Sequence, residues 1–303
     1  MVSAVTAIGA ERRGTSGQIF IFRVTHCGIA DNYFCLMKIR SGMNMNVNCY
    51  PIPSGFSSLD RITGGLHPSE FVVIAGKPAV GKTALALDIA YNTAVNCNIP
   101  VAFFSMEMPV ISITKRLSLL MNGKYDVSLQ LESELNPLAH APLYIDDTQG
   151  LRVPDFRSKA EHLIEQKNVR LLIIDYLQLF SYRDRNNLTI EEVKEKLDIL
   201  LQSLKNLAAS TGVPIIVCSQ LSRFESKKIG DNWPRFSDLY DYDLFKKNAD
   251  SLILIHRRWT SEDSNETKIT VGKFRDGEVA DIQEANMKFQ ENTVGFTDVK
   301  KSE

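Results

Sequence analysis

The sequence predicts an α/β fold in which a mostly parallel, twisted sheet is flanked by helices. Short apolar runs recur from residue 51 onward, and helical patterns separate several of them. A glycine-rich turn joins the first run to the first helix. Strands that alternate with helices form βαβ units, which have right-handed connections and build parallel sheets. Ligands bind such sheets at the carboxyl ends of the strands, so functional residues are expected there.

The individual elements follow from local patterns. Residues 71–75 form a wholly apolar run that ends at a glycine, which is typical of a buried parallel strand. A helix is expected to follow over residues 82–96. Further apolar runs predict strands at residues 100–104, 169–175, 213–218, 251–256 and 268–272.

The helix before the 213–218 strand has clear signals at both ends. Thr189 and Glu192 have the spacing of a capping box. Gly212 ends the pattern and Pro214 lies just beyond it. The apolar side chains between these ends are spaced three and four residues apart and form one stripe: Ile190, Val193, Leu197, Leu200, Leu204 and Leu207.

Composition limits the class of protein. Hydrophobic residues make up 44% and charged residues 23%, which is ordinary for a soluble globular chain. The net charge of −1 excludes a strongly basic nucleic-acid binder, but not a protein whose positive charge gathers in a channel after assembly. The five cysteines form no C-x-x-C pair, which favours reduced thiols and a cytoplasmic location. No run approaches the roughly 18 apolar residues of a membrane span.

The chain divides into two parts. Residues 1–48 carry two short apolar stretches among Gly, Ser and Asn, without clean periodicity. Three interpretations remain open for this segment: a small strand-rich appendage, a poorly ordered arm, or an over-extended reading frame, since Met43 and Met45 stand just before the organised region. Residues 49–303 are expected to form one nucleotide-binding domain.

The strongest motif is a phosphate-binding loop. It matches G-x-x-x-x-G-K-[ST] at every fixed position, between an apolar strand and a helix. The loop consists of Gly76, Lys77, Pro78, Ala79, Val80, Gly81, Lys82 and Thr83. Its backbone amides can wrap the phosphates of ATP, Lys82 supplies a positive charge for them, and the Thr83 hydroxyl can bind Mg²⁺.

Three polar residues at other strand ends are candidates for the remaining chemistry. Asp175 ends the apolar run 171–174 and is a candidate second ligand for Mg²⁺. Glu107 follows the 100–104 strand and can orient the attacking water, or can simply favour a helix N-terminus. Gln220 follows the 213–218 strand and can contact the γ-phosphate, or can be a polar strand end.

Together these motifs resemble the DnaB-type replicative DNA helicases, a hexameric family with a RecA-like P-loop NTPase fold. The resemblance covers roughly residues 52–296. Its most specific parts are the I-D-Y-L-Q-L run at residues 174–179 and the S-x-E-M-P run at 105–109. The other matching runs are residues 53–60, 64–66, 144–147, 219–223 and 273–277.

The resemblance implies an ATP-dependent helicase motor that moves on single-stranded DNA, with 5′ to 3′ polarity, as a homo-hexamer. It implies that Glu107 is the catalytic glutamate, Asp175 the Walker B acid and Gln220 a γ-phosphate sensor. It also implies that Lys273 and Arg275 reach the nucleotide of the neighbouring subunit. A helicase loader or a primase is a further expected partner, and no membrane is.

Two departures from the family support a second interpretation, a RecA-like ATPase that acts as a regulator or scaffold without unwinding DNA. Residues 1–48 do not resemble the family's N-terminal helical domain. In the run that approaches DNA in the family, an Arg is replaced by Tyr240 and a Gly by Asp243. The basic residues left as candidate DNA contacts are Arg183, Arg185, Arg223, Lys227, Lys228 and Arg235.

Overall fold

The structure is a computed structural model of the whole chain. It describes residues 5–11, 18–24, 34–39, 51–122, 137–177, 189–220, 235–236, 239, 242–257, 265–275 and 278–299. No helix in these ranges combines the length and the apolar character that crossing a bilayer requires.

The described part of the N-terminal segment forms a small sheet of its own. Strands β1 (Val5–Glu11), β2 (Gln18–Val24) and β3 (Phe34–Ile39) pair antiparallel in the order β1-β2-β3. They share no hydrogen-bonded ladder with the strands that follow residue 51, as far as the described residues show.

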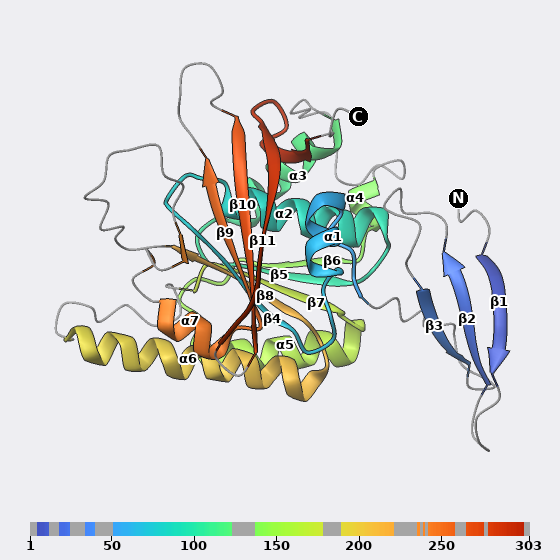
Figure 1. The fold of residues 1–303 in the computed structure, drawn as a ribbon, viewed down its shortest axis with the longest axis horizontal. Helices are drawn as coiled ribbons and strands as arrows, with labels where there is room; N and C mark the ends of the chain where they lie inside the picture. The colour runs from blue at the N-terminus through green and yellow to red at the C-terminus, as the bar shows by residue number, and fades with distance from the viewer. Residues whose placement is uncertain are drawn as a thin grey trace.

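The remaining described strands form one large sheet (Figure 1). Along the sheet the strands are β12 (Gly295–Asp298), β11 (Glu278–Gln290), β10 (Glu266–Arg275), β9 (Ser251–Arg257), β4 (Phe71–Gly76), β8 (Ile215–Gln220), β7 (Leu171–Asp175), β5 (Val101–Ser105) and β6 (Leu143–Asp146). The strands from β9 to β6 are parallel, whereas β10, β11 and β12 extend the sheet as an antiparallel edge. The predicted α/β fold with a mostly parallel sheet is therefore confirmed.

Helices cover both faces of the sheet. On one face lie α1 (Ser57–Thr63), α2 (Lys82–Tyr91) with the π-helical turn η1 (Asn92–Asn96), and α3 (Val110–Asn122). On the other face lie α5 (Val153–Lys167), α6 (Ile190–Thr211) and α7 (Tyr242–Asn248). The short α4 spans Pro137–His140.

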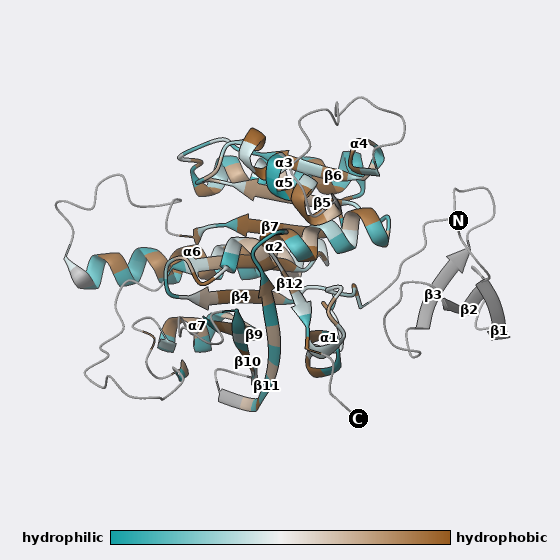
Figure 2. Ribbon diagram, turned by 90° about the horizontal axis from the view of Figure 1, so that it is seen from above, coloured by the Kyte–Doolittle hydropathy of each residue, from teal (hydrophilic) through white to brown (hydrophobic). Residues whose placement is uncertain are grey.

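The core consists of two apolar layers, one on each face of the parallel strands. Every residue of β4, β5 and β7 is buried, so these strands lack the alternation of a half-exposed sheet. Figure 2 shows the parallel strands as largely apolar bands between the helices. Burial on both faces explains why each of these strands reads as a continuous apolar run.

The predicted helix signals are present. Thr189 accepts a hydrogen bond from the Glu192 amide, and the Glu192 side chain accepts one from the Thr189 amide, which completes the capping box. Gly212 ends α6 with φ of 72°. The predicted 82–96 helix has the correct extent, but its last five residues form η1, a π-helical turn that the sequence did not indicate.

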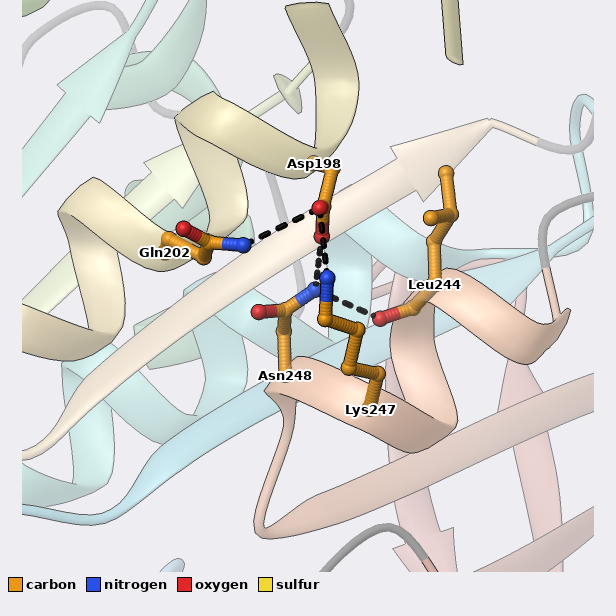
Figure 3. A network of polar contacts seen from close by, with 5 residues as sticks. All are labelled: Asp198, Gln202, Leu244, Lys247 and Asn248. Carbon is orange, nitrogen blue, oxygen red and sulfur yellow. Dashed lines mark hydrogen bonds and ion pairs between the residues drawn. The ribbon is translucent and has the colours of Figure 1, made fainter. Parts of the chain in front are cut away.

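Helix α7 is fastened to α6 by one carboxylate (Figure 3). Asp198 of α6 accepts hydrogen bonds from Lys247 Nζ at 2.6 Å and from Asn248 Nδ2 at 2.7 Å, both on α7. It also accepts one from Gln202 Nε2 at 3.0 Å, one turn along its own helix. Asp243, one of the two departures from the family pattern, lies in the first turn of this helix.

Candidate functional site

The phosphate-binding loop lies between the end of β4 and the start of α2, at the carboxyl edge of the parallel strands. Ala79 and Gly81 have positive φ values of 63° and 107°, so the backbone turns sharply in front of the helix. No side chain caps Gly81, the residue before the first turn of α2, among the described residues. Backbone amides at such a turn and at a helix N-terminus favour an anion.

The start of the loop is closely packed. A Cβ placed on Gly76 would lie 2.8 Å from Val80 Cγ2 and 2.9 Å from the Ile255 carbonyl oxygen. Only glycine fits there without moving the backbone of β9. The sequence requires glycine at this position for steric reasons as well as for the motif.

Lys82 folds back over the loop. Its ammonium donates to the carbonyl oxygens of Gly76 at 3.1 Å and Lys77 at 2.8 Å, and the residue is only 6% exposed. Burial lowers the pKa of Lys82, against the opposing effects of Cys218, Asp175 and Glu107. The ammonium therefore lies inside the loop, where a phosphate oxygen would replace its present carbonyl partners.

Asp175 faces the same loop from β7, with β8 between β7 and β4. It is 1% exposed, and burial raises its pKa, while a hydrogen bond with the Thr83 side chain lowers it. Asp175 Oδ2 is buried and has no hydrogen-bond partner among the described residues. A buried carboxylate oxygen without a partner beside a threonine hydroxyl is the arrangement that a divalent cation would complete.

Glu107 lies just beyond β5, the neighbour of β7. Ser105 pairs with Asp175 in the sheet, and the Met106 amide donates to the Asp175 carbonyl oxygen at 2.8 Å. Ser105 Oγ bonds Met108 within the same turn, donating to its carbonyl oxygen at 2.7 Å, so the turn that carries Glu107 is fixed. The Glu107 side chain is exposed, and its charge acts on both Lys82 and Asp175.

Gln220 ends β8, directly beside the end of β4, because it pairs with Gly76. Its side chain is half-buried. Strands β4, β5, β7 and β8 thus bring Lys82, Glu107, Asp175 and Gln220 to one edge of the sheet.

The structure describes some of the other predicted site residues, and the rest lie outside the described residues. Lys273 Nζ donates to the Thr63 carbonyl oxygen at the end of α1, at 3.1 Å. Arg275 ends β10, but its side chain lies outside the described residues. Arg235 is exposed. The other candidate DNA contacts lie outside the described residues: Arg183, Arg185, Arg223, Lys227 and Lys228.

A comparison with protein families identifies the family to which this chain is related. The family described as DnaB-like helicase C terminal domain matches residues 51–298, which include the nine-stranded sheet of the described residues and the whole site. The chain belongs to this family.

Similar DnaB-like proteins include the replicative DNA helicase DnaB of Geobacillus stearothermophilus, which is 34% identical over 253 residues. This alignment covers 78% of the chain and 55% of the relative, so the chain spans about half the length of that protein. The DnaB of Leifsonia xyli subsp. xyli is 33% identical over 313 residues, covering 93% of the chain and 67% of the relative.

Solved structures agree with this DnaB-like assignment. A structure titled as a DnaB-like replicative helicase and its interactions with primase has a TM-score of 0.69 at 27% identity and covers 82% of this chain and 62% of that one. A second structure, described as an ATPase domain, has a TM-score of 0.66 at 27% identity, covering 82% and 91%. The RadB recombinase, at 16% identity and a TM-score of 0.53, shares the fold. The predicted RecA-like class is confirmed.

Sequence reasoning missed two residues around this DnaB-like site. Cys218 on β8 is fully buried between Asp175 and the loop, with Sγ 3.9 Å from the Lys82 carbonyl oxygen. Burial raises the pKa of its thiol well above the usual value. Phe296, from β12, packs against Gly81. Neither residue belongs to a spacing motif, because each reaches the site only through the order of strands in the sheet.

Proposed function

We propose that this chain is the motor domain of a replicative DNA helicase, which hydrolyses ATP with Mg²⁺ and couples hydrolysis to movement along single-stranded DNA and duplex unwinding. The observation that carries the proposal is the buried Asp175 Oδ2, which lacks a partner among the described residues and lies in the same site as the Lys82 ammonium. Family membership and a phosphate loop at the carboxyl edge of the sheet support it further.

In this proposal the loop binds the nucleotide and two side chains hold its metal. The amides before α2 hold the phosphates, and the Lys82 ammonium leaves its carbonyl partners to contact their oxygens. The Thr83 hydroxyl and Asp175 would hold Mg²⁺. When bound, Mg²⁺ neutralises charge on the β- and γ-phosphate oxygens.

Glu107 and Gln220 are proposed to act on the opposite side of the γ-phosphate. Glu107 would accept a hydrogen bond from the attacking water and orient it, which its position beyond β5 and its exposed side chain support. Gln220 at the end of β8 would contact the γ-phosphate and change position when that phosphate leaves.

The assembled motor is proposed to be a homo-hexamer around one DNA strand, moving 5′ to 3′. Lys273 and Arg275 at the end of β10 would contact the neighbouring subunit's nucleotide. Lys273 would first release the Thr63 carbonyl oxygen. DNA is proposed to contact residues 181–187 and 222–235, and a helicase loader or primase is a proposed partner, in line with the primase complex of a similar structure.

The test is an ATPase and unwinding assay on a forked duplex, with sizing of the nucleotide-bound protein. We expect DNA-stimulated, Mg²⁺-dependent hydrolysis by a hexamer, and no hydrolysis by Lys82→Ala. An unchanged rate in Lys82→Ala would refute the site.

A second candidate is an ATPase that regulates or scaffolds without unwinding. The observation that favours it is the α7 segment, where Asp243 stands in a run that meets DNA in the family and the helix is fastened to α6 through Asp198. Added acids repel phosphates. Hydrolysis by a protein that forms no hexamer and opens no duplex would select this second function.

A further inference from the structure

Strand β12 lies at the outer edge of the sheet, yet it reaches the phosphate loop. It pairs antiparallel with the end of β11, with Phe296 opposite Phe289. The two rings pack edge to face, with centroids 5.2 Å apart. Phe296 is 6% exposed, so its ring belongs to the core layer that also contains α2.

The Phe296 ring touches the loop at its sharpest turn. A Cβ added to Gly81 would lie 2.6 Å from Phe296 Cζ. Gly81 is also the residue with φ of 107°, a conformation that side chains disfavour. The ring therefore occupies the space above the glycine directly before Lys82, and the glycine cannot move outward without displacing it.

The backbone of β12 is tied to the helix that the loop opens. Asp88 Oδ2 of α2 accepts a hydrogen bond from the Phe296 amide at 2.7 Å. Asp88 is 4% exposed. A Cβ on Gly295 would lie 2.7 Å from Asp88 Oδ1 and would also overlap Leu120 of α3. The strand is thus pressed against α2 and α3 immediately before Phe296.

The end of β12 is fixed to α1. Asp298 accepts hydrogen bonds from the Ser57 amide and hydroxyl, both at 2.7 Å, and from the Ser58 amide at 3.3 Å and hydroxyl. Phe56, the residue at the N-cap of α1, provides no cap of its own. The carboxylate of Asp298 therefore caps α1 from the far end of the chain.

We propose that Phe296 is a positioning residue for nucleotide binding, holding the Gly81 turn and hence Lys82, while Asp88 fixes the backbone of Phe296. This inference rests on the proposed function, because it assigns a role in the same nucleotide site. Phe296 does not touch the phosphates; it acts through Gly81. Asp298 fixes the other end of the strand, so the ring cannot withdraw without breaking contacts at α1.

Loss of the Phe296 ring is expected to weaken nucleotide binding and to change turnover much less. The loop amides must keep one arrangement to surround the phosphates, so a turn that shifts loses hydrogen bonds to the bound nucleotide. Replacing the ring with a smaller side chain leaves space above Gly81, into which the turn can relax. Glu107 and Asp175 come from other strands and keep their places, so the group that orients the water and the acidic ligand for the metal are unchanged.

The experiment compares Phe296→Leu with Phe156→Leu. Phe156 is a matched control, because it is fully buried and packs edge to face with Phe104 at 4.8 Å, but on the other face of the sheet. We expect Phe296→Leu to raise the Kd for MgATPγS and the KM for ATP about tenfold, with a much smaller change in kcat, since only loop placement is altered. The control is expected to lower the melting temperature without changing either constant.

A second pair of variants tests the amide contact. Asp88→Leu removes the acceptor for the Phe296 amide, whereas Asp88→Asn keeps a carbonyl oxygen there. We expect a raised Kd in Asp88→Leu and rescue in Asp88→Asn. Wild-type Kd in both Phe296→Leu and Asp88→Leu, with binding lost in Lys82→Ala, would overturn the role of Phe296 alone. A wild-type protein that binds no MgATPγS would overturn both this inference and the proposed function.

Discussion

Burial at the phosphate loop disfavours the charged forms of two functional side chains. Burial lowers the pKa of Lys82 and raises that of Asp175, so the attraction between the two does not offset the loss of water around either. Cys218, buried beside them, adds no charge at neutral pH because its pKa is raised well above the usual value. A phosphate oxygen near Lys82 and a cation near Asp175 would favour both charged forms.

Glu107 provides a test of the hydrolysis step at the level of one residue. Glu107→Gln keeps the size of the side chain but removes its ability to accept a proton, so we expect kcat to fall about 10²-fold or more. The Kd for MgATPγS is expected to stay unchanged, because the loop and Asp175 are untouched. Stopped-flow binding and steady-state hydrolysis measure the two quantities.

The matched control for this variant is Glu165→Gln on α5, an exposed glutamate on the opposite face of the sheet. It is expected to retain wild-type kcat. Equal turnover by Glu107→Gln and the wild type would remove Glu107 from the reaction and restore its simpler interpretation as a residue that favours a helix N-terminus.

Asp60 gives a pH-dependent prediction. Burial raises its pKa to about 6, although hydrogen bonds with Ser54, including its amide at 2.9 Å, oppose the shift. The folded state thus holds a proton that the unfolded state releases near 3.8. The resulting stabilisation is complete below 3.8 and is lost as the pH rises through about 6.

Asp60→Asn should therefore be more stable than the wild type at pH 7.5, by up to about 3 kcal/mol, since each pKa unit is worth about 1.4 kcal/mol. The advantage should vanish near pH 4. Urea unfolding at both pH values measures it, with the exposed Asp243→Asn as a control that should follow the wild type. A constant difference between Asp60→Asn and wild type across this range would contradict the titration of Asp60.

At the scale of elements, α7 packs on α6 through Phe245 in the core, and Asp198 is the centre of the polar contacts between the two helices (Figure 3). Asn248 is 3% exposed and donates to Asp198 and to the Leu244 carbonyl oxygen. The substitution Asp198→Ala removes one of the two hydrogen-bond acceptors of the buried Asn248 amide. It also removes the ion pair between Asp198 and Lys247. We expect a loss of about 1–2 kcal/mol in the free energy of unfolding, because hydrogen bonds to charged groups are worth more than exposed ion pairs.

Glu195→Ala, an exposed substitution on the same helix, is the control and should cost less. Hydrogen exchange locates the effect: amides of α7 should lose protection in Asp198→Ala, while those of β4 keep it. Uniform loss of protection through the sheet would show that Asp198 stabilises the whole fold instead of fastening α7.

The elements differ in how well the sequence predicts them. Strands β4, β5, β7, β8 and β9 were predicted to within two residues at each end, because strands buried on both faces are continuous apolar runs. Strand β11 was not predicted. Only alternate residues of its second half are buried, namely Ala285, Met287 and Phe289, and polar residues stand between them. Such a half-exposed strand gives a weak signal, since a small alanine begins the pattern.

The residues of the site also differ in how well the sequence predicts them. Lys82, Thr83 and Asp175 carry local signals, because a loop motif and an apolar strand that ends in an acid are visible in short windows of sequence. The contact between Phe296 and Gly81 joins residues that are far apart in the chain. It depends on β12 lying beside β11 and crossing α2, which no spacing in the sequence encodes.

At the scale of the whole molecule, the sheet has a parallel part and an antiparallel part. The parallel strands bring the loop, Asp175, Glu107 and Gln220 together, whereas the antiparallel strands β10 and β11 extend the sheet beyond β9 (Figure 1). Strand β12 follows β11 and returns to the loop, where Phe296 packs against Gly81. Lys273 and Arg275 end β10 on this extension, and Lys273 contacts α1 and not the loop of its own chain. In the proposed hexamer, this extension would place both residues against the next subunit.

The position of Arg275 leads to a prediction about assembled subunits. If Arg275 serves the neighbouring nucleotide, Arg275→Ala should lower kcat about 10³-fold, the lower end of the effect of such arginines in other nucleotide hydrolases, while Kd changes little. Lys82→Ala should be inactive for a different reason, because its own loop fails. Each variant alone forms only defective sites.

Mixing the two variants distinguishes action on the neighbour from action within one chain. A site is intact when the loop of an Arg275→Ala subunit meets Arg275 of a Lys82→Ala subunit. In a head-to-tail ring with random mixing, about a quarter of the interfaces meet this condition, so roughly that share of wild-type hydrolysis should return. Recovery is measured on equimolar mixtures after subunit exchange, with each variant alone as the control. An Arg275 that acts on its own chain's nucleotide would give no recovery at any mixing ratio, because every subunit would still carry one defect in its own site.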